Sequence, residues 1–209
     1  MPRKPSDISK KEFFAALPLS SAVQDHFKIY HDVLMKWQKK INLISTKTVD
    51  DIWERHFLDS GQLYKFIPDP ENNIIVDLGS GAGFPALILS IMGCRHVSAV
   101  EVDNRKCIFM SEISRLTSAP IKIINQKIEA VRDIEADIIT ARALAPVVDL
   151  IRLGLPLLKQ DGVFLLLKGE NWEAEIKEAE KYYKFSVESH SSATEAKSRI
   201  LKLFHVEQL

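Results

Sequence analysis

The most regular pattern along the chain is a helical repeat of apolar residues near the N-terminus. Between Ser20 and Ile41, apolar side chains recur at alternating steps of four and three residues, which is the period of one helix face. They are Val23, Phe27, Tyr30, Leu34, Trp37 and Ile41. This spacing predicts an amphipathic helix.

Further helices are expected on either side of it. A shorter helix is expected from about Ser6 to Leu17. A later one has on its inner side Val49, Ile52, Trp53 and Phe57. We therefore expect residues 1–72 to form a helical extension that packs on a core made by residues 73–209.

From Asn73 the pattern changes to short runs of β-branched residues that alternate with helical stretches. The predicted strands are Ile74 to Leu78, His96 to Glu101, Ile121 to Asn125, Asp137 to Ala141 and Gly162 to Leu167. Helices between them are centred near Leu89, Ile108 and Leu153. This alternation predicts a mainly parallel α/β sheet.

The C-terminal part departs from this alternation. A polar helix from Trp172 to Lys181 leads to two extended runs, Tyr183 to Ser189 and Arg199 to Val206. Because no helix separates these runs, we expect them to pair antiparallel. The predicted sheet therefore has an antiparallel strand at its C-terminal edge.

Composition narrows the class of protein. The 209 residues suffice for one well-filled domain with a small appendage, and 46% hydrophobic with 27% charged residues is typical of soluble globular proteins. No apolar run is long enough for a signal peptide or a membrane span, so a cytoplasmic protein is expected. Cys94 and Cys107 lack the spacing of a redox or zinc pair and are interpreted as buried or neutral thiols.

The charges are balanced overall but uneven along the chain. The 28 basic and 28 acidic residues argue against a protein that coats nucleic acid without selectivity. Residues 1–40 nevertheless carry eight basic and four acidic side chains. Such an excess is typical of an RNA contact and equally of a solvated helix face.

The segment most informative about function is an apolar strand that runs directly into three alternating glycines, IIVDLGSGAGFP at positions 74–85. Glycines permit positive φ and let the backbone approach a ligand closely. In an open parallel sheet, ligands bind beyond the carboxyl ends of the strands. The loop therefore predicts a ligand site, with a tight strand-to-helix connection as the alternative.

Two acidic residues indicate which ligand this loop binds. Glu101 ends the next predicted strand, where its carboxylate can accept hydrogen bonds from both ribose hydroxyls; an exposed strand-end carboxylate is the alternative. A dinucleotide fingerprint would need glycine in place of Phe84, and Asp77 would repel a pyrophosphate. Asp77 instead suits the cationic S-adenosylmethionine, directly or through water.

Other chemistries find no matching motif. The sequence lacks G-x-x-x-x-G-K-[ST] for a nucleoside triphosphate, G-x-S-x-G for an esterase and H-E-x-x-H for zinc. The six histidines do not cluster as ligands would. We therefore expect no metal.

Four motifs in order resemble one known family. The loop DLGSGAGFP (77–85) is preceded by RHFLDS (55–60) and followed by RALA (142–145) and LKG (167–169). From about Trp37 to Arg199 the chain resembles the bacterial small-subunit rRNA guanine-N7 methyltransferases, the RsmG or GidB family. The resemblance implies a Rossmann-like class I S-adenosylmethionine-dependent methyltransferase and methylation of guanosine 527 of 16S rRNA.

The resemblance also implies roles for individual residues. Arg142 is the candidate positioning residue at the catalytic centre. The reading of the loop itself adds Asp77 and Gly81. The expected cofactor-binding residues are then Asp77, Gly79, Gly81, Phe84, Glu101, Ile128, Glu129 and Arg142. The basic residues expected to contact RNA, besides Arg142, are Arg105, Lys106, Lys127, Lys168 and Arg199.

Several positions qualify this resemblance. Lys127 stands where the family pattern has arginine, Ala86 where the loop continues with glycine, and Gln38 where asparagine follows the tryptophan. Arg55 and Asp59, four residues apart, can pair with each other on a helix or contact RNA.

Methylation at N7 would ask little of catalytic side chains. This nitrogen carries a lone pair and no proton, so the reaction needs positioning and exclusion of water rather than a general base. The expected partner is 16S rRNA or the 30S subunit, and a monomer is expected. Two alternatives remain open: a methyltransferase for a small molecule or protein, and a non-catalytic RNA-binding assembly protein.

Overall fold

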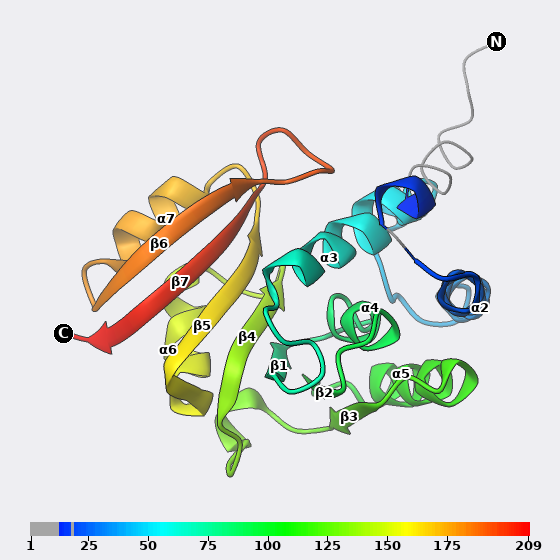
Figure 1. The fold of residues 1–209 in the computed structure, drawn as a ribbon, viewed down its shortest axis with the longest axis horizontal. Coiled ribbons are helices and arrows are strands. Elements are labelled where there is room, and N and C mark those ends of the chain that lie inside the picture. Colours follow the sequence, from blue (N-terminus) through cyan, green and yellow to red (C-terminus); the bar gives the residue numbers. More distant parts are fainter. Residues whose placement is uncertain (1–12, 18) are drawn as a thin grey trace.

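The computed structural model describes residues 13–17 and 19–209 (Figure 1). Within them a seven-stranded sheet forms the centre of the fold, with the strand order β3-β2-β1-β4-β5-β7-β6. The strands are β1 (Ile74–Leu78), β2 (His96–Val100), β3 (Ile121–Ile124), β4 (Ala136–Arg142), β5 (Leu158–Lys168), β6 (Tyr183–Ser191) and β7 (Arg199–Gln208).

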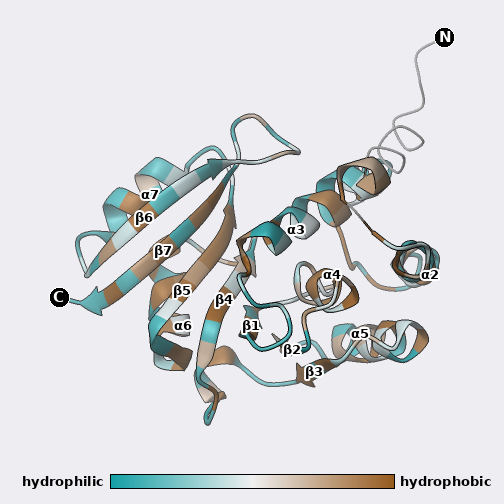
Figure 2. Cartoon of the chain, viewed as in Figure 1, coloured by the Kyte–Doolittle hydropathy of each residue, from teal (hydrophilic) through white to brown (hydrophobic). Residues whose placement is uncertain are grey.

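The pairing of the strands confirms the predicted sheet. Among β1 to β5, every adjacent pair is parallel. β7 pairs antiparallel with both β5 and β6, so the reversed strand lies one place in from the edge. The edge itself is β6, which is largely exposed and mostly polar in colour (Figure 2).

β5 is longer than the apolar pattern indicates. It begins at Leu158 rather than at Gly162. Its register with β4 shifts, because Ala136 faces Leu158 whereas Ile138 faces Val163. The polar residues 159–161 therefore belong to an irregular strand end that an apolar pattern does not reveal.

Helices cover both faces of the sheet (Figure 1). They are α2 (Ser21–Gln38), α3 (Asp59–Gly61), α4 (Ala86–Ile91), α5 (Asn104–Thr117), α6 (Val147–Gly154) and α7 (Trp172–Ala179). Shorter helical segments are η1 (Thr46–Thr48), η2 (Trp53–Leu58), η3 (Gln62–Phe66), η4 (Ile128–Ala130) and η5 (Leu155–Leu157). Among the described residues, no helix has both the length and the hydrophobicity to cross a bilayer.

The predicted helix from Ser6 to Leu17 lies largely outside the described residues. Within its described part, residues 13–16 are helical. The later N-terminal helix is confirmed, with Ile52, Trp53 and Phe57 buried. Both predicted thiols are buried and free.

Alternation along the strands divides the core into two layers. Ile75 packs in a hydrophobic cluster with α2, α4 and α5, whereas Val76 packs with α6 and α7 on the other face. Because the N-terminal helices share the first cluster with the sheet, they cover the sheet directly. The boundary predicted at residue 72 stays a prediction.

The helical segment that runs through η2, α3 and η3 begins as a π-helix. The N–H of Asp59 donates to the carbonyl of Glu54, five residues earlier. The possible pairing of Arg55 with Asp59 does not form. Arg55 pairs instead with Glu195, and Asp59 with Arg142, because the wider turn alters the α-helical i, i+4 stacking.

An aromatic cluster joins this segment to the glycine loop. The ring of Phe57 is fully buried, and its centroid lies 4.7–6.0 Å from those of Phe13, Phe27, Tyr30, Trp53 and Phe84. Tyr30 also stacks on Phe84 and donates its hydroxyl proton to the Ala82 carbonyl oxygen. The conformation of the loop therefore depends on packing by the N-terminal helices.

Replacing Phe57 tests this packing. Phe57→Ala removes a ring from a filled core, and we expect the free energy of unfolding to fall by about 3–5 kcal/mol. Tyr182→Ala is the control, because Tyr182 is 54% exposed and its loss should change stability by less than about 0.5 kcal/mol. Urea unfolding measures both, and equal losses in the two variants would contradict the proposed packing role.

Candidate functional site

Three glycines shape the loop that follows β1. Gly79, Gly81 and Gly83 have φ values of 64°, 58° and 89°, in the region that favours glycine. A Cβ on Gly79 would lie 2.6 Å from Leu144 Cδ1, and one on Gly83 would overlap Leu87. A Cβ on Gly81 would meet only the Gly79 carbonyl oxygen, at 3.9 Å, so this side of the loop is open to a ligand.

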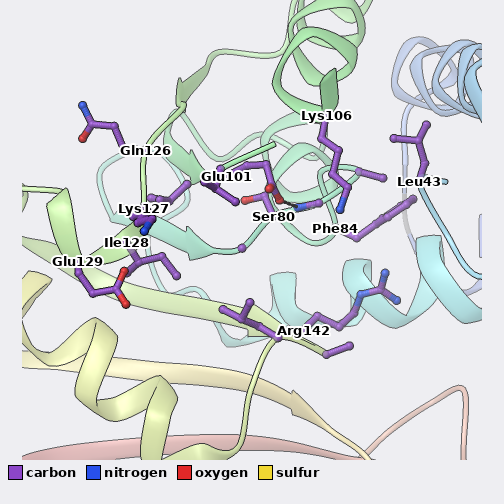
Figure 3. A pocket seen from close by; sticks show the side chains of 17 residues that line it. Leu43, Ser80, Phe84, Glu101, Lys106, Gln126, Lys127, Ile128, Glu129 and Arg142 are labelled. Atoms are coloured by element: carbon purple, nitrogen blue, oxygen red, sulfur yellow. Dashed lines mark hydrogen bonds between the residues drawn. The ribbon is translucent and has the colours of Figure 1, made fainter. Parts of the chain in front are cut away.

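A cavity of about 460 Å³, which we call the loop cavity, is lined by Gly79 and Gly81 and lies at the carboxyl ends of β1, β2 and β4. Figure 3 shows side chains that line it. This volume is within the range of small-molecule and cofactor sites. The predicted residues that line it are Gly79, Gly81, Phe84, Glu101, Lys106, Lys127, Ile128, Glu129 and Arg142.

Glu101 links the glycine loop to the start of α5. Its Oε2 accepts a hydrogen bond from the Gly81 N–H at 2.8 Å, and its Oε1 accepts one from the Asp103 N–H at 2.8 Å. The residue is only 7% exposed and lines the loop cavity. A carboxylate has further lone pairs, so it can also accept hydrogen bonds from a ligand's hydroxyl groups.

Asp77 lies beneath the loop rather than in the lining of the cavity. It is fully buried, and its Oδ1 accepts a hydrogen bond from the Thr140 hydroxyl at 2.9 Å. Burial raises the pKa of Asp77 to about 7, although the hydroxyls of Ser80 and Thr140 act in the opposite direction. The predicted contact of Asp77 with the cofactor stays a prediction.

Arg142, the last residue of β4, joins the glycine loop to the N-terminal helices. Its guanidinium carbon lies 5.1 Å from the Phe84 ring centroid, and Nη1 donates to the Arg55 carbonyl oxygen at 3.0 Å. Nη1 also lies 3.6 Å from Asp59 Oδ2. Burial lowers the pKa of Arg142, but a guanidinium stays protonated at physiological pH.

His56 is held as a single tautomer between Arg142 and Thr48. Arg142 Nη2 lies 2.8 Å from His56 Nδ1, and the Thr48 hydroxyl oxygen lies 2.7 Å from His56 Nε2. Because a guanidinium can only donate, Nδ1 accepts and the imidazole proton is on Nε2. Burial, followed by the charges of Arg142 and Arg55, lowers the pKa of His56 to about 3, so the ring is neutral at physiological pH.

A second cavity of about 250 Å³ adjoins the loop cavity, and Arg142 and Ala143 line both. We call it the basic cavity, because Arg55, Lys168 and Arg199 also line it. Two of these cations are already paired. Lys168 Nζ lies 2.6 Å from Glu175 Oε2, and Arg55 Nη1 lies 2.5 Å from Glu195 Oε2.

The predicted basic residues thus divide between two adjoining cavities. Those that line at least one of them are Lys106, Lys127, Arg142, Lys168 and Arg199. Arg105 lines neither, because its side chain is 69% exposed and pairs with Asp103 at the start of α5.

The structure adds residues that the sequence pattern does not single out. Leu43 lines the loop cavity, and Thr194 and Glu195 line the basic cavity. The Thr194 hydroxyl donates to Asp59 Oδ1 at 3.0 Å, which holds the loop between β6 and β7 against the N-terminal helical segment. The RHFLDS motif is the signal that could have indicated this contact, since it contains Asp59.

The sheet order, the glycine loop after β1 and the acid after β2 define the class I S-adenosylmethionine-dependent methyltransferase fold. A magnesium protoporphyrin IX methyltransferase from Synechocystis, solved with bound S-adenosylmethionine, is similar with a TM-score of 0.61, 13% identity and coverage of 89% of this chain and 99% of that one. TYW2 from M. jannaschii, in complex with the same compound, is similar with a TM-score of 0.58, 19% identity and coverage of 82% and 80%. These similarities confirm the predicted fold class.

Sequence comparison shows the family. The family model GidB, rRNA small subunit methyltransferase G, matches residues 23–203. Ribosomal RNA small subunit methyltransferase G from Paramagnetospirillum magneticum is 40% identical over 201 residues, which are 96% of this chain and 98% of that protein. The corresponding protein from Rickettsia prowazekii is 37% identical over 193 residues, 92% of this chain and all of that one. The chain therefore belongs to the rRNA small subunit methyltransferase G family, and the resemblance read from its motifs is confirmed.

The protonation of His56 predicts a pH-dependent contribution to stability. Its pKa is about 3 in the folded protein and 6.5 for a histidine exposed to solvent, so the unfolded chain binds more protons between these pH values. Relative to His56→Gln, the wild type should gain stability as the pH rises from about 3 to 6.5, by up to about 1.4 kcal/mol per pH unit, and the difference should be constant above that.

Denaturant unfolding at several pH values measures this difference. His96→Gln is the matched control, because His96 is exposed. A difference between wild type and His56→Gln that does not change with pH would show that His56 is not held neutral.

Proposed function

We propose that the protein transfers a methyl group from S-adenosylmethionine to N7 of a guanosine in 16S rRNA, at the position that the family resemblance implies. The observation that supports this most is that the loop cavity and the basic cavity share Arg142 and Ala143. A cavity in the size range of small-molecule and cofactor sites then adjoins one that basic side chains line. The names of the family and of the relatives also give ribosomal RNA as the substrate.

The residues of the loop cavity fit S-adenosylmethionine, which supplies the methyl group and carries a positive sulfonium. Glu101 would accept hydrogen bonds from the ribose hydroxyls, and the open side of Gly81 leaves room for the ligand against the backbone. Ile128 and Glu129 would contact the adenine end. Asp77 would act through water or by supporting the loop.

The proposed reaction needs no general base, because guanine N7 is nucleophilic without losing a proton. The side chains then have to orient the base and exclude water. Arg142 is the proposed positioning residue. Arg142 lines both cavities, and its five N–H groups exceed its contacts with Arg55, His56 and Asp59. Guanine O6 is an acceptor next to N7.

The proposed RNA contacts are electrostatic. Lys106, Lys127, Lys168 and Arg199 line the two cavities, and Arg105 is exposed at the start of α5. Phosphate groups would compete with Glu175 and Glu195 for the cations of the basic cavity. We also propose that the protein acts in the cytoplasm as a monomer, on 16S rRNA or on the 30S subunit.

Methyl transfer to rRNA tests the proposed function. Purified protein with methyl-labelled S-adenosylmethionine and 30S subunits or rRNA from cells lacking the gene should label a single guanosine, which aniline cleavage identifies as 7-methylguanosine. Cofactor binding without transfer to rRNA would instead favour a methyltransferase for a small molecule or protein. No cofactor binding would favour an RNA-binding assembly protein.

Glu101→Gln tests the proposed ribose contact. Hydrogen bonds to a charged group contribute about 1.5–3 kcal/mol, so affinity for S-adenosylmethionine should fall roughly 10- to 100-fold in calorimetric titration. Glu135→Gln is the control, because Glu135 is exposed next to the amino end of β4, away from the loop cavity. Wild-type affinity in Glu101→Gln would contradict the assigned role.

A further inference from the structure

A third hollow, of about 620 Å³, lies beside the loop cavity. Residues 38–46, where α2 ends and the chain turns toward η1, form most of it, and Lys106 of α5 completes it. Lys39 and Lys40 are among these residues, whereas no aspartate or glutamate is. We call this surface the lysine hollow.

The turn that forms the lysine hollow is held in one conformation by Gln38. The side-chain oxygen of Gln38 accepts hydrogen bonds from the N–H groups of Leu43 and Ile44, at 2.9 and 3.0 Å. Its side-chain nitrogen donates to the Ile44 carbonyl oxygen at 2.8 Å. The glutamine that departs from the family pattern therefore fastens the turn to the end of α2.

The two walls of the hollow are also fastened to each other. The indole N–H of Trp37 on α2 donates to Glu112 Oε2 on α5 at 2.8 Å. α5 also carries Lys106, so the three lysines are presented from a rigid support. A ligand that binds there would not have to order the backbone first.

The lysines of the hollow differ from Arg55 and Lys168 of the basic cavity in having no acidic partner among the described residues. Within the described part of the chain, none of Lys39, Lys40 and Lys106 forms an ion pair. Lys39 and Lys40 are exposed, and Lys106 is half-buried. Lysines that line one hollow and have no ion-pair partner attract a polyanion without having to give up another partner.

The hollow is continuous with the proposed reaction site. Leu43 and Lys106 line both the lysine hollow and the loop cavity, just as Arg142 and Ala143 line both the loop cavity and the basic cavity. The lysine hollow, the loop cavity and the basic cavity therefore follow one another across the molecule, with the loop cavity in the middle. A strand whose target base enters beside Arg142 can continue over the loop cavity to the lysines.

We infer that the lysine hollow binds backbone phosphates of the rRNA strand that carries the target nucleotide. This inference rests on the proposed function. On this inference, Lys39 and Lys40 contact the substrate. Part of the positive charge at the N-terminal end of the chain then has a role beyond solvation. Phosphate binding at this site adds affinity and register without reading the base sequence.

The variant Lys39→Ala/Lys40→Ala tests the inference by the binding of rRNA. Two lost phosphate contacts should lower the slope of log affinity against log salt by about 1.4 and weaken binding on the order of tenfold near 0.1 M salt. Filter binding with an unmethylated 16S rRNA transcript and with 30S subunits measures both quantities. Affinity for S-adenosylmethionine should be unchanged, and in the transfer assay KM for RNA should rise at constant kcat.

Two matched variants separate a phosphate contact from a structural effect. Lys39→Arg/Lys40→Arg keeps both charges and should bind RNA with nearly wild-type affinity and salt dependence. Lys122→Ala/Lys177→Ala removes two exposed lysines from β3 and α7 that are outside the three cavities, and should also bind normally.

The outcomes distinguish this inference from the proposed function. A Lys39→Ala/Lys40→Ala protein with wild-type affinity and salt slope would overturn the inference and leave methyl transfer intact. A loss seen with 30S subunits but not with protein-free rRNA would also overturn it, in favour of a contact with a ribosomal protein. Failure of the wild type to methylate rRNA would instead overturn the proposed function.

Discussion

The contacts of the Arg142 guanidinium hold the site together. They connect the end of β4 to Phe84 in the glycine loop and to His56 and Asp59 in the N-terminal helical segment. Asp59 in turn accepts a hydrogen bond from Thr194, in the loop between β6 and β7. A buried guanidinium is costly unless it is paired and hydrogen-bonded, so these segments are stable only together. The residues of the site are therefore held in place by contacts within the chain.

The charge balance of the loop cavity suits a reaction that moves positive charge. Methylation at N7 would transfer positive charge from the sulfonium to the purine, so a strong anion near the sulfonium would stabilise the ground state and slow the reaction. Asp77 is kept out of the lining, and burial raises its pKa to about 7, which reduces its negative charge near neutral pH. Glu101, whose two oxygens are fixed by backbone N–H groups, is instead suited to an uncharged ribose.

The cations around the site fall into two physical classes. In the basic cavity, Lys168 and Arg55 are paired with glutamates and can exchange those partners for a substrate. In the lysine hollow, Lys39 and Lys40 have no ion-pair partner among the described residues and add long-range attraction. The chain can therefore have zero net charge and still present a basic path beside the loop cavity.

The sequence by itself determined the features that depend on neighbouring residues. The apolar periods predict α2 and the five parallel strands, and the strand followed by alternating glycines predicts the ligand loop, because both are local patterns of burial and backbone freedom. Only the tertiary structure decided that Asp77 lies beneath the loop, that Arg105 lines neither cavity, and that β7 lies between β5 and β6. It also decided the partners of Arg55 and Asp59, since a π-turn and a loop more than 130 residues away replace the local pairing. Such contacts depend on which distant groups must neutralise a buried charge, and no local pattern records that requirement.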